Sequence, residues 1–231
     1  MDIQQHFTHI KKIIAETAEA CHRSPESVLL LAVSKQQNES AIREAHQLGI
    51  NDFAENYFQE GQAKIAALKD LAITWHFIGP IQSNKAKGIA VNYNWVHSLN
   101  RLEVANSLNE HRTAQLPPLN VCLQINLVAE ETKSGIAPSE ALELAQAVSR
   151  LPQLRLRGLM TIPPPMKNAA EQYELYLQLN HLMHSLNQQL PIPMDTLSMG
   201  MSDDFIPAIQ AGSTIVRIGQ ALFGPRERKS L

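Results

Sequence analysis

Short apolar segments of the chain alternate with longer segments that carry apolar residues at helical spacing. Eight of the short segments have the length and residue types of β-strands, at 28–34, 52–54, 74–78, 95–98, 120–127, 156–161, 196–199 and 214–218. Helices are predicted at 39–48, 57–71, 101–111, 138–151 and 170–190, with shorter ones at 84–90 and 204–211 and an extra helix over 1–14. This alternation is typical of βαβ units and of a parallel sheet.

The number of strands favours a closed barrel over an open sheet. Eight strands with intervening helices in 231 residues match the (β/α)8 barrel, whereas doubly wound sheets usually have fewer strands. With 44% hydrophobic and 18% charged residues, the chain can bury one large core. We therefore expect the α/β class, with a single (β/α)8 TIM barrel domain over residues 1–231 and an extra N-terminal helix.

Charge and cysteine content argue against several classes of function. The net charge is -2 and no basic run contains interleaved aromatic residues, so a nucleic-acid partner is not expected. No apolar segment approaches the roughly 18 residues of a membrane span. Cys21 and Cys122 are far apart and have no metal-ligand spacing, so neither a disulfide framework nor a zinc site is predicted. These features favour a cytoplasmic protein that interacts with neither membranes nor nucleic acid.

The residues that follow the predicted strands define the candidate site, because the chemistry of such barrels lies at the carboxyl ends of the strands. Hydroxyls, amides and glycines are frequent there, whereas clusters of Asp, Glu and His are rare. This composition favours a surface that binds a phosphate and a ring over a metal site or a carboxylate pair. The residues are Lys35, Glu55, Asn56, Gly79–Asn84, Ser98, Asn126, Thr161–Pro163, Gly200–Ser202 and Gly219.

Lys35 ends the apolar run LLLAVS (29–34), so its amine is expected near a desolvated rim of the barrel. Burial disfavours the charged form of a lysine and lowers its pKa. An amine that loses its proton near neutral pH can form an imine with an aldehyde. A solvated lysine, or one that pairs directly with a phosphate, explains the same position, and Lys35 alone does not decide between these alternatives.

The last two predicted strands carry a candidate phosphate site. Ser202 is predicted to be the N-cap of the following helix, and Gly219 follows the last strand and allows close approach of the backbone. Asp203 and Asp204 would repel a phosphate, so this interpretation requires both side chains to point outward; a simple capping sequence is the alternative. Arg217 has the same facing as Gly219 and needs a partner, either a ring nitrogen or a buried carboxylate.

Seven segments together resemble the pyridoxal phosphate homeostasis protein family (YggS/PROSC type). They occur in the order of that family and cover essentially the whole chain, so the resemblance is specific. The segments are AVSK (32–35), ENYFQE (55–60), WHFIGPIQSNK (75–85), VHSLNR (96–101), LRGLMTIP (156–163), LSMGMSDDF (197–205) and AGSTIVRIGQALFG (211–224).

The resemblance implies a barrel similar to the N-terminal domain of alanine racemase that binds pyridoxal 5'-phosphate (PLP). Lys35 matches the lysine that forms the Schiff base in that family. Ser202 and Gly219 match phosphate-binding positions, and Arg217 matches the arginine that faces the pyridine nitrogen.

Asn56 and His76 match motif residues near the cofactor of that family. The residues alone favour another interpretation of the histidines, because His76 and His97 lie within strand patterns, where a satisfied core histidine is more common than a catalytic one. Two positions depart from the family pattern: Ala54 stands where glycine is expected, and Asn100 where aspartate is usual. Neither departure affects an expected cofactor contact.

The resemblance leaves two functions with PLP open, and the site composition leaves a third. An arginine at the ring nitrogen weakens the electron sink of PLP, which favours a carrier or regulator of intracellular PLP with PLP-dependent apoenzymes as recipients. We expect a monomer, because the resemblance lacks the second domain that completes a shared active site in the related racemases. The alternative is a low-activity PLP-dependent amino-acid racemase or lyase, which needs a proton donor such as His76, Tyr57 or Cys122. A barrel isomerase that binds a phosphorylated sugar without PLP is the third.

Overall fold

The computed structural model describes residues 2–128, 134–164, 166 and 168–224. Eight parallel strands form a closed barrel in chain order, and the last strand pairs with the first, with Leu31 opposite Arg217. The strands are β1 (Leu29–Val33), β2 (Asp52–Glu55), β3 (Thr74–Phe77), β4 (Trp95–Leu99), β5 (Leu119–Gln124), β6 (Leu154–Met160), β7 (Thr196–Met201) and β8 (Ile215–Ile218). The predicted (β/α)8 barrel is confirmed.

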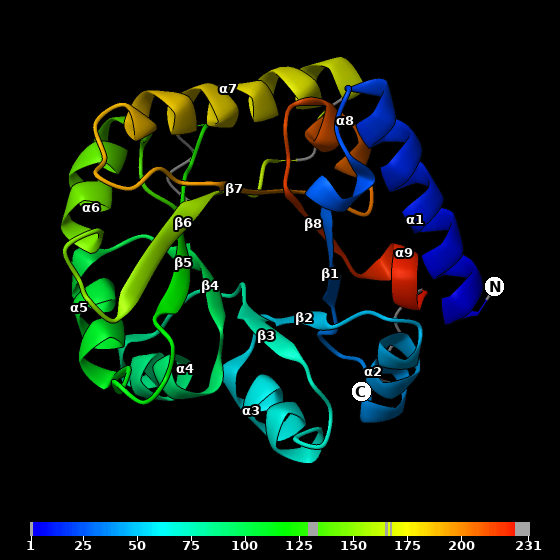
Figure 1. Cartoon of the computed structure of the whole chain (residues 1–231), viewed down its shortest axis with the longest axis horizontal. Helices are drawn as coiled ribbons and strands as arrows, with labels where there is room; N and C mark the ends of the chain where they lie inside the picture. The colour runs from blue at the N-terminus through cyan, green and yellow to red at the C-terminus, as the bar shows by residue number, and fades with distance from the viewer. Residues whose placement is uncertain (1, 129–133, 165, 167, 225–231) are drawn as a thin grey trace.

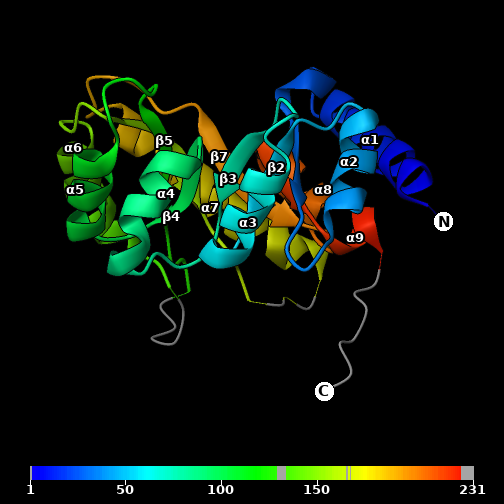
Figure 2. The same ribbon diagram turned by 90° about the horizontal axis from the view of Figure 1, so that it is seen from below.

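Helices surround the strands on the outside of the barrel (Figure 1). They are α1 (Ile3–Ala20), α2 (Glu39–Gln47), α3 (Phe58–Ala67), α4 (Ala86–Asn92), α5 (Leu102–His111), α6 (Ala141–Val148), α7 (Ala169–Asn187), α8 (Phe205–Gln210) and α9 (Gln220–Phe223). Each predicted helix is present with shifted ends, whereas α9 is additional. Figure 2 shows α3 in front of β2 and β3, and α3 contacts β2 on the outside of the barrel.

Alternation along the strands divides the core into two layers. Leu30 and Ala32 belong to the large apolar layer between the strands and the helices. Leu31, Val33 and Ile215 belong to a smaller cluster with Ala54. Successive side chains of a strand point to opposite faces, so the members of the smaller cluster point into the barrel. Residues two positions further along these strands therefore also face the barrel interior or its rim.

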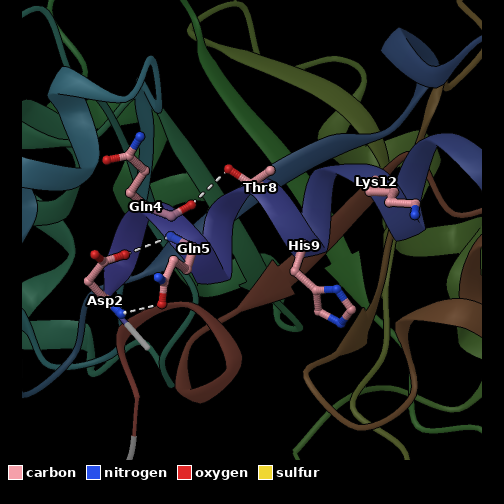
Figure 3. Close-up of a pocket in the computed structure, with 6 residues that line it drawn as sticks. All are labelled: Asp2, Gln4, Gln5, Thr8, His9 and Lys12. Atoms are coloured by element: carbon pink, nitrogen blue, oxygen red, sulfur yellow. Dashed lines mark hydrogen bonds between the residues drawn. The ribbon is translucent and has the colours of Figure 1, made fainter.

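The N-terminal helix α1 packs against α8 and α9 on the outside of the barrel, and its His6 Nδ1 lies 3.0 Å from the Leu222 carbonyl oxygen of α9. The helix begins after Asp2, whose carboxylate accepts a hydrogen bond from the Gln5 amide at 2.8 Å. The first turns of α1 line a shallow pocket (Figure 3), but all of its lining residues come from residues 2–12. This pocket is therefore separate from the strand ends.

No helix in the described part of the chain has both the length and the apolar character needed to cross a membrane.

Arg112 ties the end of α5 to the end of α4 through a buried guanidinium that is 4% exposed. Nη1 donates to the carbonyl oxygens of Ala90 and Tyr93 at 2.6 and 2.7 Å, and Nε donates to Pro117 O at 2.8 Å. The variant Arg112→Met leaves these carbonyls without their donors, so we expect the free energy of unfolding to fall by about 2–3 kcal/mol in urea titrations.

The matched control is Arg43→Met, because Arg43 forms a bidentate pair with Asp70 at the surface. Exposed ion pairs contribute about 0–1 kcal/mol, so this variant should lose much less stability. Equal losses in the two arginine variants would contradict the role assigned to Arg112.

Candidate functional site

Lys35 and Gly219 come together at the rim where the carboxyl ends of the strands meet. Lys35 lies half-buried in the turn after β1, and Gly219 directly follows β8. The two strands pair with Ala32 opposite Ile218. A Cβ atom at Gly219 would lie 3.3 Å from the Val33 carbonyl oxygen, so β8 leaves the barrel in tight contact with the end of β1. The expected lysine and the expected phosphate position are therefore neighbours.

Ser202 lies beside Gly219, but in a different role from the one predicted. The prediction that Ser202 is the N-cap of α8 is wrong, because α8 begins at Phe205 and its N-cap is Asp204. The Ser202 hydroxyl instead accepts a hydrogen bond from the Ala221 amide of α9 at 3.3 Å. The Ser202 hydroxyl and the backbone at Gly219, directly before α9, come together here, and a hydroxyl beside a close-approaching glycine fits an anion such as a phosphate.

The expectation that both aspartates after Ser202 point outward is wrong for Asp204. Asp203 is exposed, whereas Asp204 is 8% exposed. Its carboxylate accepts hydrogen bonds from the Tyr176 hydroxyl at 2.8 Å and from the Met201 amide at 2.6 Å. These donors hold Asp204 in the protein interior. Burial and the adjacent Asp204 carboxylate raise the pKa of the Tyr176 hydroxyl, which therefore stays protonated as a donor.

Arg217 lies in the barrel interior and is 3% exposed. Nη1 donates to the carbonyl and hydroxyl oxygens of Ser198 at 2.6 and 3.0 Å, and Nη2 donates to Thr161 O at 2.9 Å. These partners are neutral oxygens rather than a buried carboxylate. They use three of the five N–H groups of a guanidinium. Burial lowers the pKa of Arg217 from its ordinary value.

A row of hydrogen bonds crosses the barrel interior from Arg217 to Asp52. The Ser198 hydroxyl is 2.7 Å from His97 Nδ1, His97 Nε2 is 2.9 Å from His76 Nδ1, and His76 Nε2 is 3.0 Å from the Asp52 carboxylate. Asp52 is the first residue of β2, whereas Arg217 is next to last in β8. The row therefore connects the amino-terminal end of the barrel to the neighbourhood of the candidate site.

The direction of this row follows from its Asp52 end, because a carboxylate only accepts. With both imidazoles neutral, His76 and His97 each donate from Nε2 and accept at Nδ1, and the Ser198 hydroxyl donates to His97. Burial lowers the pKa of both histidines, and the charge of Arg217 lowers that of His97 further. Protein atoms thus occupy both ring nitrogens of His76, and the expected place of His76 near the cofactor stays a prediction.

Asn56 follows β2 and lies at the rim, in line with the prediction that strand-end amides gather there. Its Oδ1 atom is buried without a hydrogen-bond partner in the described structure. A Cβ atom at Gly79 would lie 1.9 Å from the Asn56 carbonyl oxygen, so the next loop approaches closely. A buried acceptor without a partner fits a donor group on a ligand. The Asn56 Oδ1 acceptor without a partner and the close approach at Gly219 together fit a site for PLP at the rim.

Asp52, Ser198 and the link between the histidines were not predicted from the sequence. Their partners are 19 to 101 residues apart along the chain, so local patterns cannot pair them. The available signal is that these polar residues stand at inward-facing positions of predicted strands, where unpaired polar groups are costly. The described residues contain no group of three or more His, Cys, Asp or Glu side chains that could hold a metal.

Comparison with protein families supports this type of barrel. The family described as "Alanine racemase, N-terminal domain" matches residues 9–227. An alanine racemase from Corynebacterium glutamicum superposes with a TM-score of 0.71 at 16% identity, covering 99% of this chain and 63% of that protein, and shares the fold. The fold and the site thus define a barrel of the alanine racemase N-terminal type.

Full-length relatives specify the family further. A protein from Pseudomonas aeruginosa named "Pyridoxal phosphate homeostasis protein" is 52% identical over 225 residues, covering 97% of this chain and 96% of that protein. A protein of the same name from Escherichia coli is 49% identical over 229 residues, covering 98% and 97%. PipY of Synechococcus elongatus, solved with PLP bound, has a TM-score of 0.82 and 38% identity, covering 91% and 100%. The chain belongs to the pyridoxal phosphate homeostasis protein family.

The neutral histidines predict a pH dependence of stability. The unfolded chain binds protons at His76 and His97 as the pH falls through about 6.5, whereas the folded chain does not, so the free energy of unfolding should fall. The slope reaches up to about 1.4 kcal/mol per pH unit for each histidine. Burial raises the pKa of Glu55, which acts in the opposite direction at pH values above its ordinary value of 4.5. Urea titrations of the wild type and of a variant that lacks one of the histidines, compared at each pH, therefore isolate the histidine contribution.

The variant His97→Phe should flatten this slope, whereas the exposed His184→Ala should keep the slope of the wild type. Equal slopes in the wild type and in His97→Phe between about pH 7.5 and 5.5 would contradict the neutral row.

Proposed function

We propose that this chain binds PLP at the carboxyl end of the barrel as a Schiff base on Lys35 and acts in PLP homeostasis. The observation that carries the proposal is the placement of a half-buried Lys35 next to the tight approach at Gly219, which fits an aldehyde and a phosphate of one molecule. Membership of a family whose relatives are named for PLP homeostasis, and the PLP bound to PipY, support the ligand. When bound, PLP supplies an aldehyde that reacts with an amine.

Each site residue has a defined task in this proposal. Lys35 would hold PLP through its amine, and the aldehyde that PLP supplies forms an imine with loss of one water, a reaction that hydrolysis reverses. The Ser202 hydroxyl and the backbone at Gly219 would bind the phosphate. Arg217 would place positive charge on the side of the ring nitrogen and disfavour its protonation. Asn56 Oδ1 would accept a hydrogen bond from a donor group of the ligand.

A carrier or regulator of PLP is favoured over a racemase or lyase, because the candidate proton donors are poorly suited. Both ring nitrogens of His76 are bonded within the barrel, so they do not face a substrate. Burial raises the pKa of the Cys122 thiol to about 12, which makes its thiolate scarce at neutral pH. Tyr57 is 59% exposed on the rim. Reversible holding of PLP, followed by transfer to apoenzymes, fits these side chains better than turnover.

We also propose that the protein is a cytoplasmic monomer. The two cysteines are free thiols, which suits a reducing compartment. The barrel closes on itself and leaves no strand edge to be paired by a second copy. Mass measurements on dilution that retain a dimer would contradict the monomer.

The variant Lys35→Ala tests the Schiff base. Wild-type protein with added PLP should gain a visible absorption band, whereas the variant should show none, because the proposal assigns the imine to Lys35 alone. Loss of the covalent bond should also weaken PLP retention on dialysis by at least about tenfold. The control Lys12→Ala, which changes an exposed lysine of α1, should behave as wild type. Absence of the band in wild type would sink the proposal and favour the isomerase that binds a phosphorylated sugar.

Turnover separates the carrier from the enzyme. Loaded protein incubated with amino acids in D2O should leave the Cα proton unexchanged, because the candidate donors His76, Tyr57 and Cys122 are poorly suited to serve that carbon. The same loaded protein mixed with an apoenzyme that needs PLP should restore the activity of that enzyme. Exchange at Cα that depends on Lys35 would favour the racemase or lyase.

A further inference from the structure

The turn that carries Lys35 is held by a buried ion cluster from the next strand and helix. Lys64 of α3 is 6% exposed, and its ammonium donates to Glu55 Oε1 at 2.8 Å and to Glu60 Oε1 at 2.7 Å. Its third contact is the carbonyl oxygen of Ser34 at 2.6 Å. An ammonium has three protons, so Lys64 is fully engaged. One of the three contacts reaches the residue directly before Lys35.

The residue directly after Lys35 is tied to the same cluster. The Gln36 amide donates to Glu60 Oε1 at 2.5 Å, and the Ser34 hydroxyl donates to Glu55 Oε1 at 2.6 Å. The φ angle of Gln36 is 62°, in the left-handed region that non-glycine residues rarely adopt. Such a conformation persists when the surrounding contacts hold it. The carboxylate of Glu60 holds it here, together with the backbone hydrogen bond from the Gln37 amide to the Ser34 carbonyl oxygen at 3.0 Å.

The cluster forms as a unit because each charge depends on the others. Glu60 precedes Lys64 by four residues on α3, the favourable orientation for such a pair. Glu55 is fully buried and has no other cation among its described ion pairs. Removing one partner leaves the remaining charges buried and unpaired, which is more costly than losing a surface pair. A change at Glu60 or Lys64 is therefore transmitted to both peptide neighbours of Lys35.

We propose that Lys64 and Glu60 are positioning residues that hold the turn 34–37 in the conformation in which the Lys35 amine reaches the ligand. This inference rests on the proposed Schiff base at Lys35. A lysine side chain has several rotatable bonds, so a fixed backbone at its base reduces the conformations that must be lost before reaction. Lys64 itself does not form the Schiff base, since all three of its protons are engaged.

The contacts of Lys64 and Glu60 with the turn 34–37 are called the clamp below. Amide hydrogen exchange without PLP tests the clamp directly. In Glu60→Ala the Gln36 amide loses its acceptor, so its exchange should become at least about tenfold faster, while amides of β1 keep their wild-type rates. Glu60→Gln retains an oxygen for the Gln36 amide and should keep most of the protection. The control Arg43→Ala breaks an exposed ion pair between α2 and the loop after α3, and it should leave the Gln36 amide unchanged.

The rate at which the visible band appears after PLP is added tests the consequence for Lys35. We expect Glu60→Ala and Lys64→Met to react at least about tenfold more slowly than wild type, with Glu60→Gln between them and wild type. The final band in Glu60→Gln should have the wild-type position, because Lys35 is intact. Should Lys64→Met fail to fold, the two Glu60 variants carry the test, since Glu60 lies at the partly exposed end of the cluster.

The outcomes separate this inference from the proposed function. Faster exchange at Gln36 together with a wild-type reaction rate would show that the clamp does not position Lys35, and the inference would fail while the Schiff base stood. A wild-type exchange rate of the Gln36 amide in Glu60→Ala would show that Glu60 does not hold the turn, and the clamp would be contradicted. A wild-type protein that forms no band would overturn the Schiff base and, with it, any positioning for that reaction.

Discussion

Closure of the parallel sheet is the constraint on which the rest of this structure depends. Because β8 pairs with β1, the turn after Val33 and the glycine after Ile218 are forced together, although almost the whole chain separates them. The same closure leaves a barrel interior that side chains must fill. In this protein the candidate site at the rim lies directly above this filled interior. The same closed set of strands therefore positions both the candidate site and the core.

The barrel interior contains the row of hydrogen bonds from Arg217 to Asp52 in addition to apolar side chains. Asp52 at one end can only accept, so with both imidazoles neutral the intervening groups have one consistent arrangement. Two neutral imidazoles then carry the connection without burying additional charge. Trp95 stacks on His76 with ring centroids 5.5 Å apart, which fixes the plane of that imidazole. Three hydrogen bonds hold the Arg217 guanidinium, so its positive charge has a fixed position near the rim.

The sequence predicted the strands, their closure and most of the rim, because these depend on local periodicity and on the position of a residue at a strand end. It did not predict the roles of Ser202 and Asp204. The Ser202 hydroxyl accepts a hydrogen bond from the Ala221 amide of α9 and does not cap α8, and the Asp204 carboxylate points inward to the Tyr176 hydroxyl. Helix α9 has four residues, too few for a periodic pattern. The ion cluster was also missed, since Lys64 on a helix resembles a solvated lysine until the turn after β1 is packed against it.

The proposed covalent bond between Lys35 and PLP is tested most directly by reduction with borohydride. Reduced protein is digested, and the mass of each lysine-containing peptide is measured. The account predicts a stable PLP adduct on the peptide that contains Lys35 and on no other. An adduct on a different lysine such as Lys64 or Lys85, or none at all, would contradict it.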